Sequence, residues 1–441
     1  MFIFALCLGI VVLALLSRFD RKEPFVRELR IEGLEPRIAP AALTAKFAGG
    51  VLIIAGDPAA ANVDIVEAAG SIEVFDGVAS LGAFEGVKNI TAKVQGGATV
   101  TAILVDGGIS GSFRMAATGS TTFVLTAGSQ IDGALTLTGD IAAQTLSVGN
   151  NVVIGKSLTF NGAEGLDVFA IGAGTTIGGS ANFSAIESGG FDTSTVIDIG
   201  KNLAFRNAST TLNVLIQCSG SAGENVAGAM TYLGGRGGDT LSLMGTIDGN
   251  AKFVDASGNN NLGIALNSVV RGTVLMVTGS GNDILNIQSG TVERNVTLKL
   301  GSGNNAFNYG IAGGVVIAGN LSMTTGDGND QWKTSGGGMT LGGNLTMRLG
   351  DGANSMIASV NVAGNKVSVR VGGGVDIVSI DGSATNAKLA FSLGAGADTL
   401  AGTLLRNSVS AVFDGGAGID HFVENTLTGD PITIVGFEDF T

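Results

Sequence analysis

The chain has 441 residues, of which 45% are apolar and only 14% are charged, with 72 glycines and 5 prolines. Such a composition can bury a large core, so it excludes a disordered polymer. The net charge of −13 argues against nucleic-acid binding, which requires basic patches that neutralise phosphates, whereas it permits bound cations.

Residues 1–16, MFIFALCLGIVVLALL, form an uninterrupted apolar run. As a helix they would span roughly 24 Å at 1.5 Å per residue, which is short of the ~30 Å hydrocarbon core of a bilayer. We interpret residues 1–17 as an export signal or, if the segment is not removed, as a membrane anchor; the alternative is a buried helix. Either of the first two interpretations predicts an extracellular or cell-surface location.

Residues 18–45 read as a linker that is first charged and then rich in proline and alanine. Within it, Leu34-Glu35-Pro36-Arg37 resembles the short LEPR motif near the N-terminus of many large exported bacterial surface proteins. The resemblance implies that the chain is exported.

Residues 46–118 read as short strands, because apolar runs such as VLIIAG and alternating runs such as NITAKV are bounded by Gly, Asp or Asn. No segment after residue 45 shows the 3.6-residue period of a helix. We expect this block to be an N-terminal β cap on the region that follows.

Residues 119–425 contain a repeat whose clearest sign is a Gly-x-Gly-x-Asp/Asn element followed by an alternating apolar run. We call the final Asp or Asn of each element the anchor. Successive anchors lie 21 to 25 residues apart, and they are Asp239, Asn260, Asp283, Asn305, Asp330, Asn354, Asp376, Asp398 and Asp420. Upstream, the spacing continues more loosely through Asp167, Asp192 and Asn213.

A unit of about 22 residues with two or three short strands cannot close a core alone, but stacked units can. The sequence therefore predicts an all-β parallel β-helix, or β-solenoid, with ~22-residue rungs and small β caps at both ends. Residues 426–441 would form the C-terminal cap, which protects the open edge of the last rung. Glycine suits the corners because it tolerates positive φ, and Asp or Asn suits them because its side chain bonds nearby backbone.

Two corners, at residues 234–241 and 415–422, also resemble the hemolysin-type (RTX) calcium repeat, and four others keep its G-x-G-x-D core. The resemblance implies Ca²⁺ as a cofactor, bound by the carboxylates of Asp239, Asp283, Asp330, Asp376, Asp398 and Asp420. We expect the last three to bind first, because no Asn separates them and their charges would repel. The alternative is that all these residues are purely structural corners.

Nothing in the sequence indicates an enzyme. His421 is the only histidine, no Cys/His cluster suggests zinc, and the Gly-x-Gly elements precede strands rather than helices, which excludes a P-loop. We expect an exported structural or adhesive surface protein that contacts cell-envelope or matrix components and associates with itself. The alternative is a carbohydrate-active β-helix enzyme, which would show a groove with clustered acidic and basic side chains.

Overall fold

The computed structural model describes residues 42–440 except 59–61, 105–107, 164, 208–214, 221–222, 266, 311–312, 335, 385, 403–409 and 424–431. The predicted 1–17 segment and the LEPR motif lie outside the described residues. Every regular element in the described part is a β-strand, which confirms the all-β prediction. The described residues hold no helix of the length and hydropathy needed to cross a membrane.

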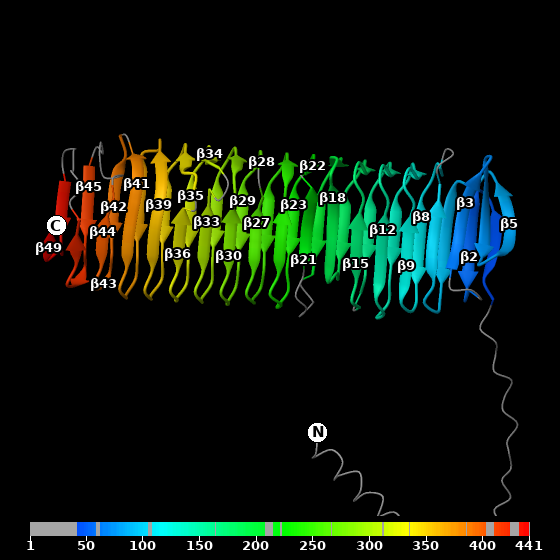
Figure 1. Cartoon of the computed structure of the whole chain (residues 1–441), viewed down its shortest axis with the longest axis horizontal. Coiled ribbons are helices and arrows are strands. Elements are labelled where there is room, and N and C mark those ends of the chain that lie inside the picture. Colours follow the sequence, from blue (N-terminus) through cyan, green and yellow to red (C-terminus); the bar gives the residue numbers. More distant parts are fainter. Residues whose placement is uncertain are drawn as a thin grey trace, which may run out of the picture. The chain divides into compact units, whose positions relative to one another are not determined.

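The strands of residues 42–440 stack into a rod of parallel rungs, so the predicted β-solenoid is confirmed (Figure 1). Each full rung supplies one strand to each of three faces. Neighbouring strands pair in parallel mostly at offsets near the predicted 22 residues, for example Val274 with Val296 and Val367 with Leu389.

The first face carries one strand from each rung. Its strands are β2 (Val51–Gly56), β6 (Asn89–Val94), β8 (Phe113–Ala117), β11 (Leu135–Thr138), β14 (Leu158–Asn161), β17 (Ala181–Ser184), β20 (Leu203–Arg206), β23 (Met230–Leu233), β26 (Ala251–Val254), β29 (Val274–Val277), β32 (Val296–Lys299), β35 (Leu321–Thr324), β38 (Leu345–Arg348), β40 (Lys366–Arg370), β42 (Lys388–Ser392), β45 (Ser410–Asp414) and β48 (Ile432–Val435).

The second face follows the first along the chain in every rung. Its strands are β3 (Asn62–Ala68), β7 (Thr99–Ile103), β9 (Thr121–Leu125), β12 (Gln144–Val148), β15 (Val168–Ile171), β18 (Ser188–Thr193), β21 (Leu215–Gly220), β24 (Thr240–Leu243), β27 (Asn261–Ile264), β30 (Ile284–Ile287), β33 (Ala306–Tyr309), β36 (Gln331–Thr334), β39 (Ser355–Val362), β41 (Ile377–Ala384), β44 (Thr399–Ala401), β47 (His421–Phe422) and β49 (Asp439–Phe440).

The third face consists of short strands and ends in the C-terminal halves of β39 and β41. Its other strands are β10 (Gln130–Ile131), β13 (Val153–Ile154), β16 (Thr176–Ile177), β19 (Ile197–Ile199), β22 (Glu224–Val226), β25 (Gly245–Ile247), β28 (Ser268–Val270), β31 (Gly290–Val292), β34 (Val315–Ile317) and β37 (Met339–Leu341). Two further short strands, β43 (Ala395–Gly396) and β46 (Ala417–Gly418), pair at the corner between the first and second faces.

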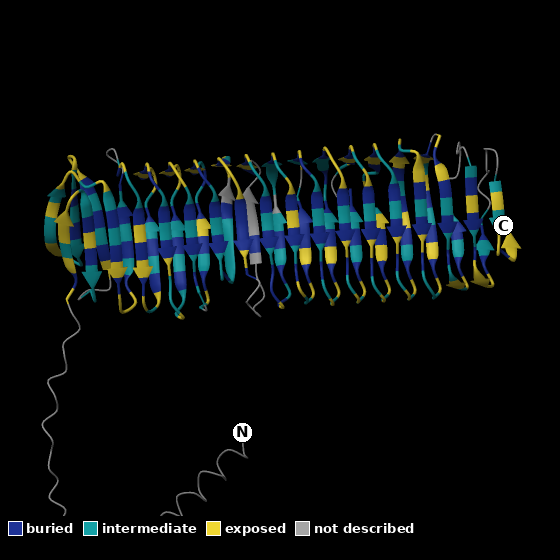
Figure 2. Cartoon of the chain, turned by 180° about the vertical axis from the view of Figure 1, so that it is seen from behind, coloured by how far each residue is buried: buried dark blue, intermediate teal, exposed yellow. Residues whose placement is uncertain are grey.

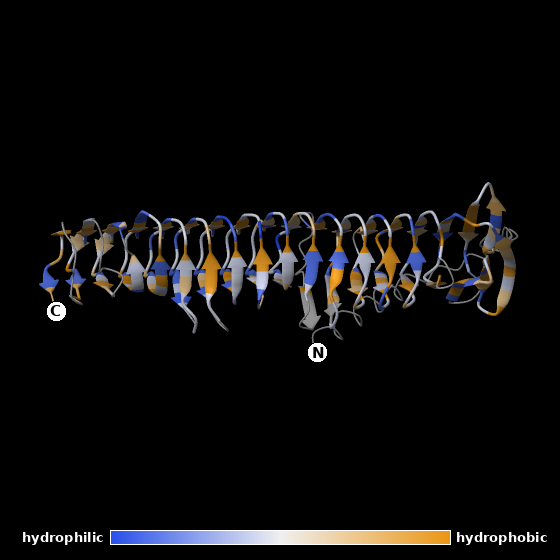
Figure 3. Ribbon diagram, turned by 90° about the horizontal axis from the view of Figure 1, so that it is seen from above, coloured by the Kyte–Doolittle hydropathy of each residue, from blue (hydrophilic) through white to orange (hydrophobic). Residues whose placement is uncertain are grey.

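Antiparallel strands occur at the N-terminal end of the rod, where they surround the first rung (Figure 3). β1 (Thr44–Ala48) pairs with β2, and β4 (Ser71–Asp76) joins β3 to β5 (Ala79–Glu85). The parallel stacking already begins with β2 and β6. A free strand edge would invite pairing with another chain, so these antiparallel strands protect the start of the stack.

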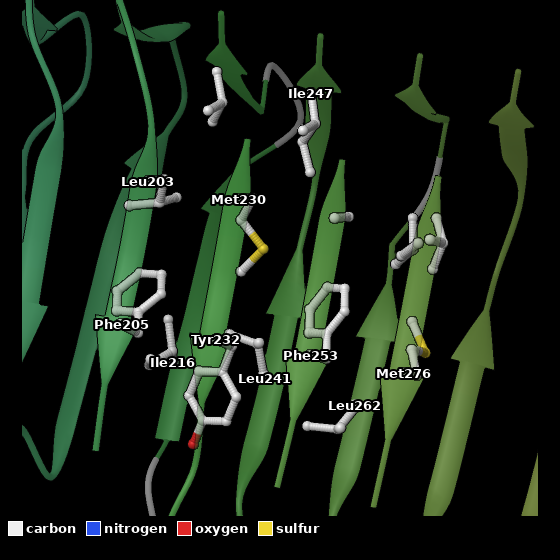
Figure 4. Close-up of a cluster of buried hydrophobic side chains, with 14 of the residues drawn as sticks. Leu203, Phe205, Ile216, Met230, Tyr232, Leu241, Ile247, Phe253, Leu262 and Met276 are labelled. Atoms are coloured by element: carbon white, nitrogen blue, oxygen red, sulfur yellow. The ribbon is translucent and has the colours of Figure 1, made fainter. Parts of the chain in front are cut away.

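The core is one continuous cluster of buried side chains, and buried residues alternate with more exposed ones along the strands (Figure 2). On the first face the register places Phe160, Phe183, Phe205, Tyr232 and Phe253 one above another. The rings of Phe183 and Phe205 are stacked with centroids 5.2 Å apart. Figure 4 shows this column continuing from Phe205 through Tyr232 to Phe253 on successive strands.

Candidate functional site

The anchors line the corner that connects the first face to the second, on the edge of the rod where β43 is labelled in Figure 1. Each anchor is the residue directly before a second-face strand. All nine, including the six predicted calcium ligands, are at most 2% exposed. The structure therefore brings the predicted site residues into one buried column.

The column is a continuous hydrogen-bond ladder. The backbone N–H of each anchor donates to the side-chain Oδ1 of the anchor one rung further along, from Asp239 through Asp420. Asp376 N donates to Asp398 Oδ1, and Asp398 N donates to Asp420 Oδ1, both at 2.8 Å. Because backbone groups buried at a corner must find partners, these bonds explain why every rung needs a side-chain oxygen here.

The asparagine anchors make a second set of bonds within their own corner. Asn354 Nδ2 donates to the carbonyls of Gly350 and Gly352. Asn305 Nδ2 bonds the carbonyls of the two glycines at the same positions of its own corner. The side chain thus ties the turn to itself as well as to the preceding rung, whose anchor N–H donates to its Oδ1.

The second glycine of the element, two residues before the anchor, lies where a side chain cannot fit. Gly328 and Gly352, for example, have φ of +144° and +129°. A Cβ on Gly328 would collide with the carbonyl oxygen of Gly303, and one on Gly352 with that of Gly328. The repeated glycine is therefore required both by backbone conformation and by the close approach of neighbouring rungs.

Most aspartate anchors have one carboxyl oxygen without a hydrogen-bond partner, whereas Oδ2 of Asp239 accepts from the Tyr232 hydroxyl at 2.6 Å. In Asp283, Asp376, Asp398 and Asp420, Oδ2 is buried and has no hydrogen-bond partner among the described residues. A protonated Oδ2 would carry an O–H where an asparagine anchor carries Nδ2–H. A neutral carboxyl group can thus replace asparagine in this column.

Burial favours this neutral form. It raises the pKa of Asp398 to about 6, against the hydrogen bond from Asp376 N–H and with the help of the neighbouring carboxyls of Asp376 and Asp420. Burial also raises the pKa values of Asp376 and Asp330. Asp167, whose Oδ1 accepts from Gln144 N–H, has its pKa raised to about 6 by burial.

These carboxyls have a limited capacity to hold calcium in the described geometry. Oδ1 already accepts a backbone N–H in Asp283, Asp330, Asp376, Asp398 and Asp420, whereas Ca²⁺ takes six to eight oxygen ligands. Among the described residues, no three His, Cys, Asp or Glu side chains gather as a metal-binding group. Calcium binding at Asp376, Asp398 and Asp420 stays a prediction.

Sequence reasoning did not find two acidic residues of this corner. Asp255 is buried beside Asp239, and both carboxyl groups approach the space next to Gly234. Burial, and then the neighbouring Asp239, raises the pKa of Asp255 to about 8. Glu438 ends the ladder, because its Oε2 accepts from Asp420 N–H at 2.9 Å. The signal for Asp255 was a carboxylate directly after an alternating apolar run, AKFVD.

One of the anchors predicted upstream of Asp239 was wrong. Asp192 lies inside β18, where it pairs with Ser219, and the register puts Glu187 at the anchor level instead. Asp167 does occupy the anchor column, and Asn213 lies outside the described residues.

The corner between the third and first faces carries a second ladder that runs in the opposite direction. Asn320 N donates to Asn295 Oδ1, and Asn344 N donates to Asn320 Oδ1. Here the side chain of each rung bonds the backbone of the rung that follows it. The two corners together fasten every rung in this part of the rod to both neighbours.

A depression of about 430 Å³ lies on the outer surface beside β19, β22 and β25. Asp198, Asn225, Asp248 and Arg271 line it. Arg271 Nη1 contacts Asp248 Oδ1 at 2.6 Å, and Asn225 Nδ2 donates to Asp198 Oδ1. It is a surface hollow in which acidic and basic groups meet, although its charged groups are already paired.

The fold and the corner ladders define a β-solenoid repeat protein. Comparisons of the chain with protein-family models, with curated proteins and with solved structures found no match.

Proposed function

We propose that this β-solenoid is an exported structural or adhesive rod of the cell surface or extracellular space. The observation that carries the structural role is the unbroken parallel stack, in which first-face strands pair in order from β2 to β48. One hydrophobic core runs through all of these rungs. A repeat stack of this kind presents a long surface to partners.

The export part of the proposal is supported by the apolar residues 1–16 and by the resemblance of residues 34–37 to the LEPR motif. The low fraction of charged residues in the chain and its many Ser, Thr, Asn and Gly residues are compatible with an extracellular β-protein. Calcium bound at the anchor corners would add to the stability of such a rod by mass action.

Deleting residues 1–17 is expected to leave the protein in the cytoplasm of a bacterial host, whereas the full chain reaches the cell surface. The measurement is fractionation of intact cells with and without chelator, combined with protease treatment of whole cells. Full chain found only in the cytosol would contradict the surface role. Truncated chain found on the surface would show that another segment directs export.

A second candidate function, a carbohydrate-active enzyme, is favoured by the depression at Asp248 and Arg271, the kind of mixed-charge site that the sequence analysis named as its sign. The test is release of reducing ends from acidic polysaccharides by the purified chain and by an Asp248→Asn variant. We expect no release from either; release by the parent that the variant loses would establish the enzyme.

A further inference from the structure

The outer surface of the first face is basic, although the whole chain is acidic. The first-face strands together with β1 carry ten basic residues and one acidic residue, Asp414. All ten basic residues are exposed, and they are Lys46, Lys93, Arg114, Arg206, Lys252, Lys299, Arg348, Lys366, Arg370 and Lys388. With 37 acidic and 24 basic residues in the chain, an even distribution would give the opposite balance.

The strands of the other two faces, with β4 and β5, show the reverse. They carry one lysine, Lys333, against ten acidic residues, which are Asp64, Glu67, Glu73, Asp76, Glu85, Asp192, Asp198, Glu224, Asp381 and Asp439. Charge is therefore segregated by face. Net charge alone conceals the segregation, because the positive charge of the first-face strands and the negative charge of the other strands largely cancel.

The basic residues are most concentrated on β38, β40 and β42. Lys366 and Arg370 stand four residues apart on β40, on the same outward side, so roughly 13 Å separates their Cα atoms. The register places Arg348 directly beside Arg370 and Lys388 directly beside Lys366. These four residues, which we call the basic patch, form two like-charge pairs on strands ~4.8 Å apart.

Like charges directly opposite one another destabilise a sheet, so the fold itself gains nothing from these pairs. Nor do acidic side chains compensate them. Within the described residues, no carboxylate lies within 4 Å of any of the four cations. Asp414 is one strand beyond β42 and registers with Ser392 rather than with a basic residue. The corners beside the patch carry Asp327 and Asp351, outside the strands.

We propose that the basic patch of Arg348, Lys366, Arg370 and Lys388 is a docking surface for an acidic polysaccharide. A carboxylated sugar chain laid on the face would bring repeated anionic groups to the paired cations and remove their mutual repulsion. Lys299 and Thr324, which share the outward column of Arg348 through the register, extend the surface along the rod. The inference rests on the proposed adhesive function and names the class of its partner.

The surface favours a sugar polymer over nucleic acid. Single-stranded nucleic acid is held by stacking on exposed aromatic side chains, but Trp332, Tyr232 and Tyr309 are all buried. A duplex is read by a helix or ribbon that enters a groove, and this face is a continuous sheet. An acidic polysaccharide requires only spaced cations and hydrogen-bond donors, which the patch and its threonine and serine neighbours supply.

The test measures binding of the purified full chain to polygalacturonate, to neutral dextran and to duplex DNA at low and high salt. The parent is expected to bind polygalacturonate, more weakly as salt rises, and to leave dextran unbound. Changing Arg348, Lys366, Arg370 and Lys388 together to Gln should weaken polygalacturonate binding at least tenfold. Because the four side chains are exposed and repel one another, the variant should melt no lower than the parent.

A matched control changes four exposed cations outside the first-face strands, Lys156, Lys201, Arg236 and Lys333, to Gln. It alters net charge equally and should keep parental affinity. An equal loss of polygalacturonate affinity in both variants would show that only net charge matters, which would overturn the proposal that the basic patch is the docking surface. No binding of polygalacturonate by the parent would overturn the proposal while leaving the surface location, tested by fractionation, intact. Tighter binding of DNA would assign the patch to nucleic acid instead.

Discussion

Replacing Gly328 with alanine is expected to destabilise the rod by roughly 3 kcal/mol or more, because it combines a strained backbone with a steric clash. Gly328 has φ of +144°, a conformation that alanine rarely adopts. The added Cβ would also meet the carbonyl oxygen of Gly303 in the preceding rung. Relief would require the two rungs to separate, which would break the ladder at Asn305 and Asp330.

The measurement is the midpoint of thermal or denaturant unfolding, with hydrogen exchange to locate the rungs that open. Gly263→Ala is the matched control. Gly263 lies in β27, and a Cβ there would have its nearest contact at 3.6 Å, an ordinary van der Waals distance. It should leave stability unchanged or raise it by about 0.4–1 kcal/mol. A Gly328→Ala variant that melts like the control would show that these corners are not close-packed.

The rod is expected to lose stability as pH rises from about 4 to 7, the opposite of ordinary acid unfolding. Burial raises the folded-state pKa of Asp398 and of Asp167 to about 6, above the value of 3.8 for an exposed aspartate. Their contribution is fully present below 3.8 and is lost as pH rises through 6. A shift of this size corresponds to roughly 2–3 kcal/mol per group. Asp140 acts in the other direction, because backbone N–H bonds from Ala142 and Gly119 lower its pKa.

An Asp398→Asn variant isolates one of these groups. Asparagine already fills the same column at Asn354, so the substitution keeps the ladder and removes the buried acid. At pH 7.5 the variant should melt higher than the parent, and its melting temperature should change less between pH 4.5 and 7.5. Asp414→Asn, a change at a less buried strand residue, is the control. A variant that melts lower than the parent at pH 7.5 would mean that the charged carboxylate is needed.

Bound calcium would explain an Asp398→Asn variant that melts lower than the parent at pH 7.5. If Ca²⁺ occupies the corners of Asp376, Asp398 and Asp420, millimolar Ca²⁺ should raise the melting temperature of the parent at pH 7.5 relative to EDTA. The rise should disappear in Asp398→Asn. An unchanged parent would leave these aspartates as neutral corner residues, and a rise that survives in the variant would place the ion elsewhere.

The sequence predicted the fold because its strongest signals are local and repeated. Alternating apolar residues predicted where the strands lie, and the interval between anchors predicted the length of one rung. The nine anchors from Asp239 to Asp420 were all placed correctly in one column. The glycine two residues before each anchor, such as Gly328, was also recognised as a corner residue. The structure adds a second reason, the close approach of the preceding rung.

Features that depend on register could not be predicted in the same way. Asp192 was taken for an anchor because a constant period cannot account for rungs of unequal length, and Glu187 holds that level. Asp255 and Asp239 come together only when one rung stacks on another. The basic patch escaped notice for the same reason. Lys366 and Lys388 lie 22 residues apart in the chain, and only strand pairing makes them neighbours.

The opposite directions of the two corner ladders bear on how such a protein evolves. At the anchor corner each rung bonds the backbone of the rung before it, and at the Asn320 corner each rung bonds the rung after it. One rung thus carries the groups that join it to both neighbours. Tandem duplication of the gene segment for a single rung would lengthen the rod by about 4.8 Å without creating a new kind of junction. The rung that carries the antiparallel strands β1, β4 and β5 and the rung that Glu438 bonds differ from this pattern, so the rungs between them are the ones that duplication could add or remove without changing the cross-section.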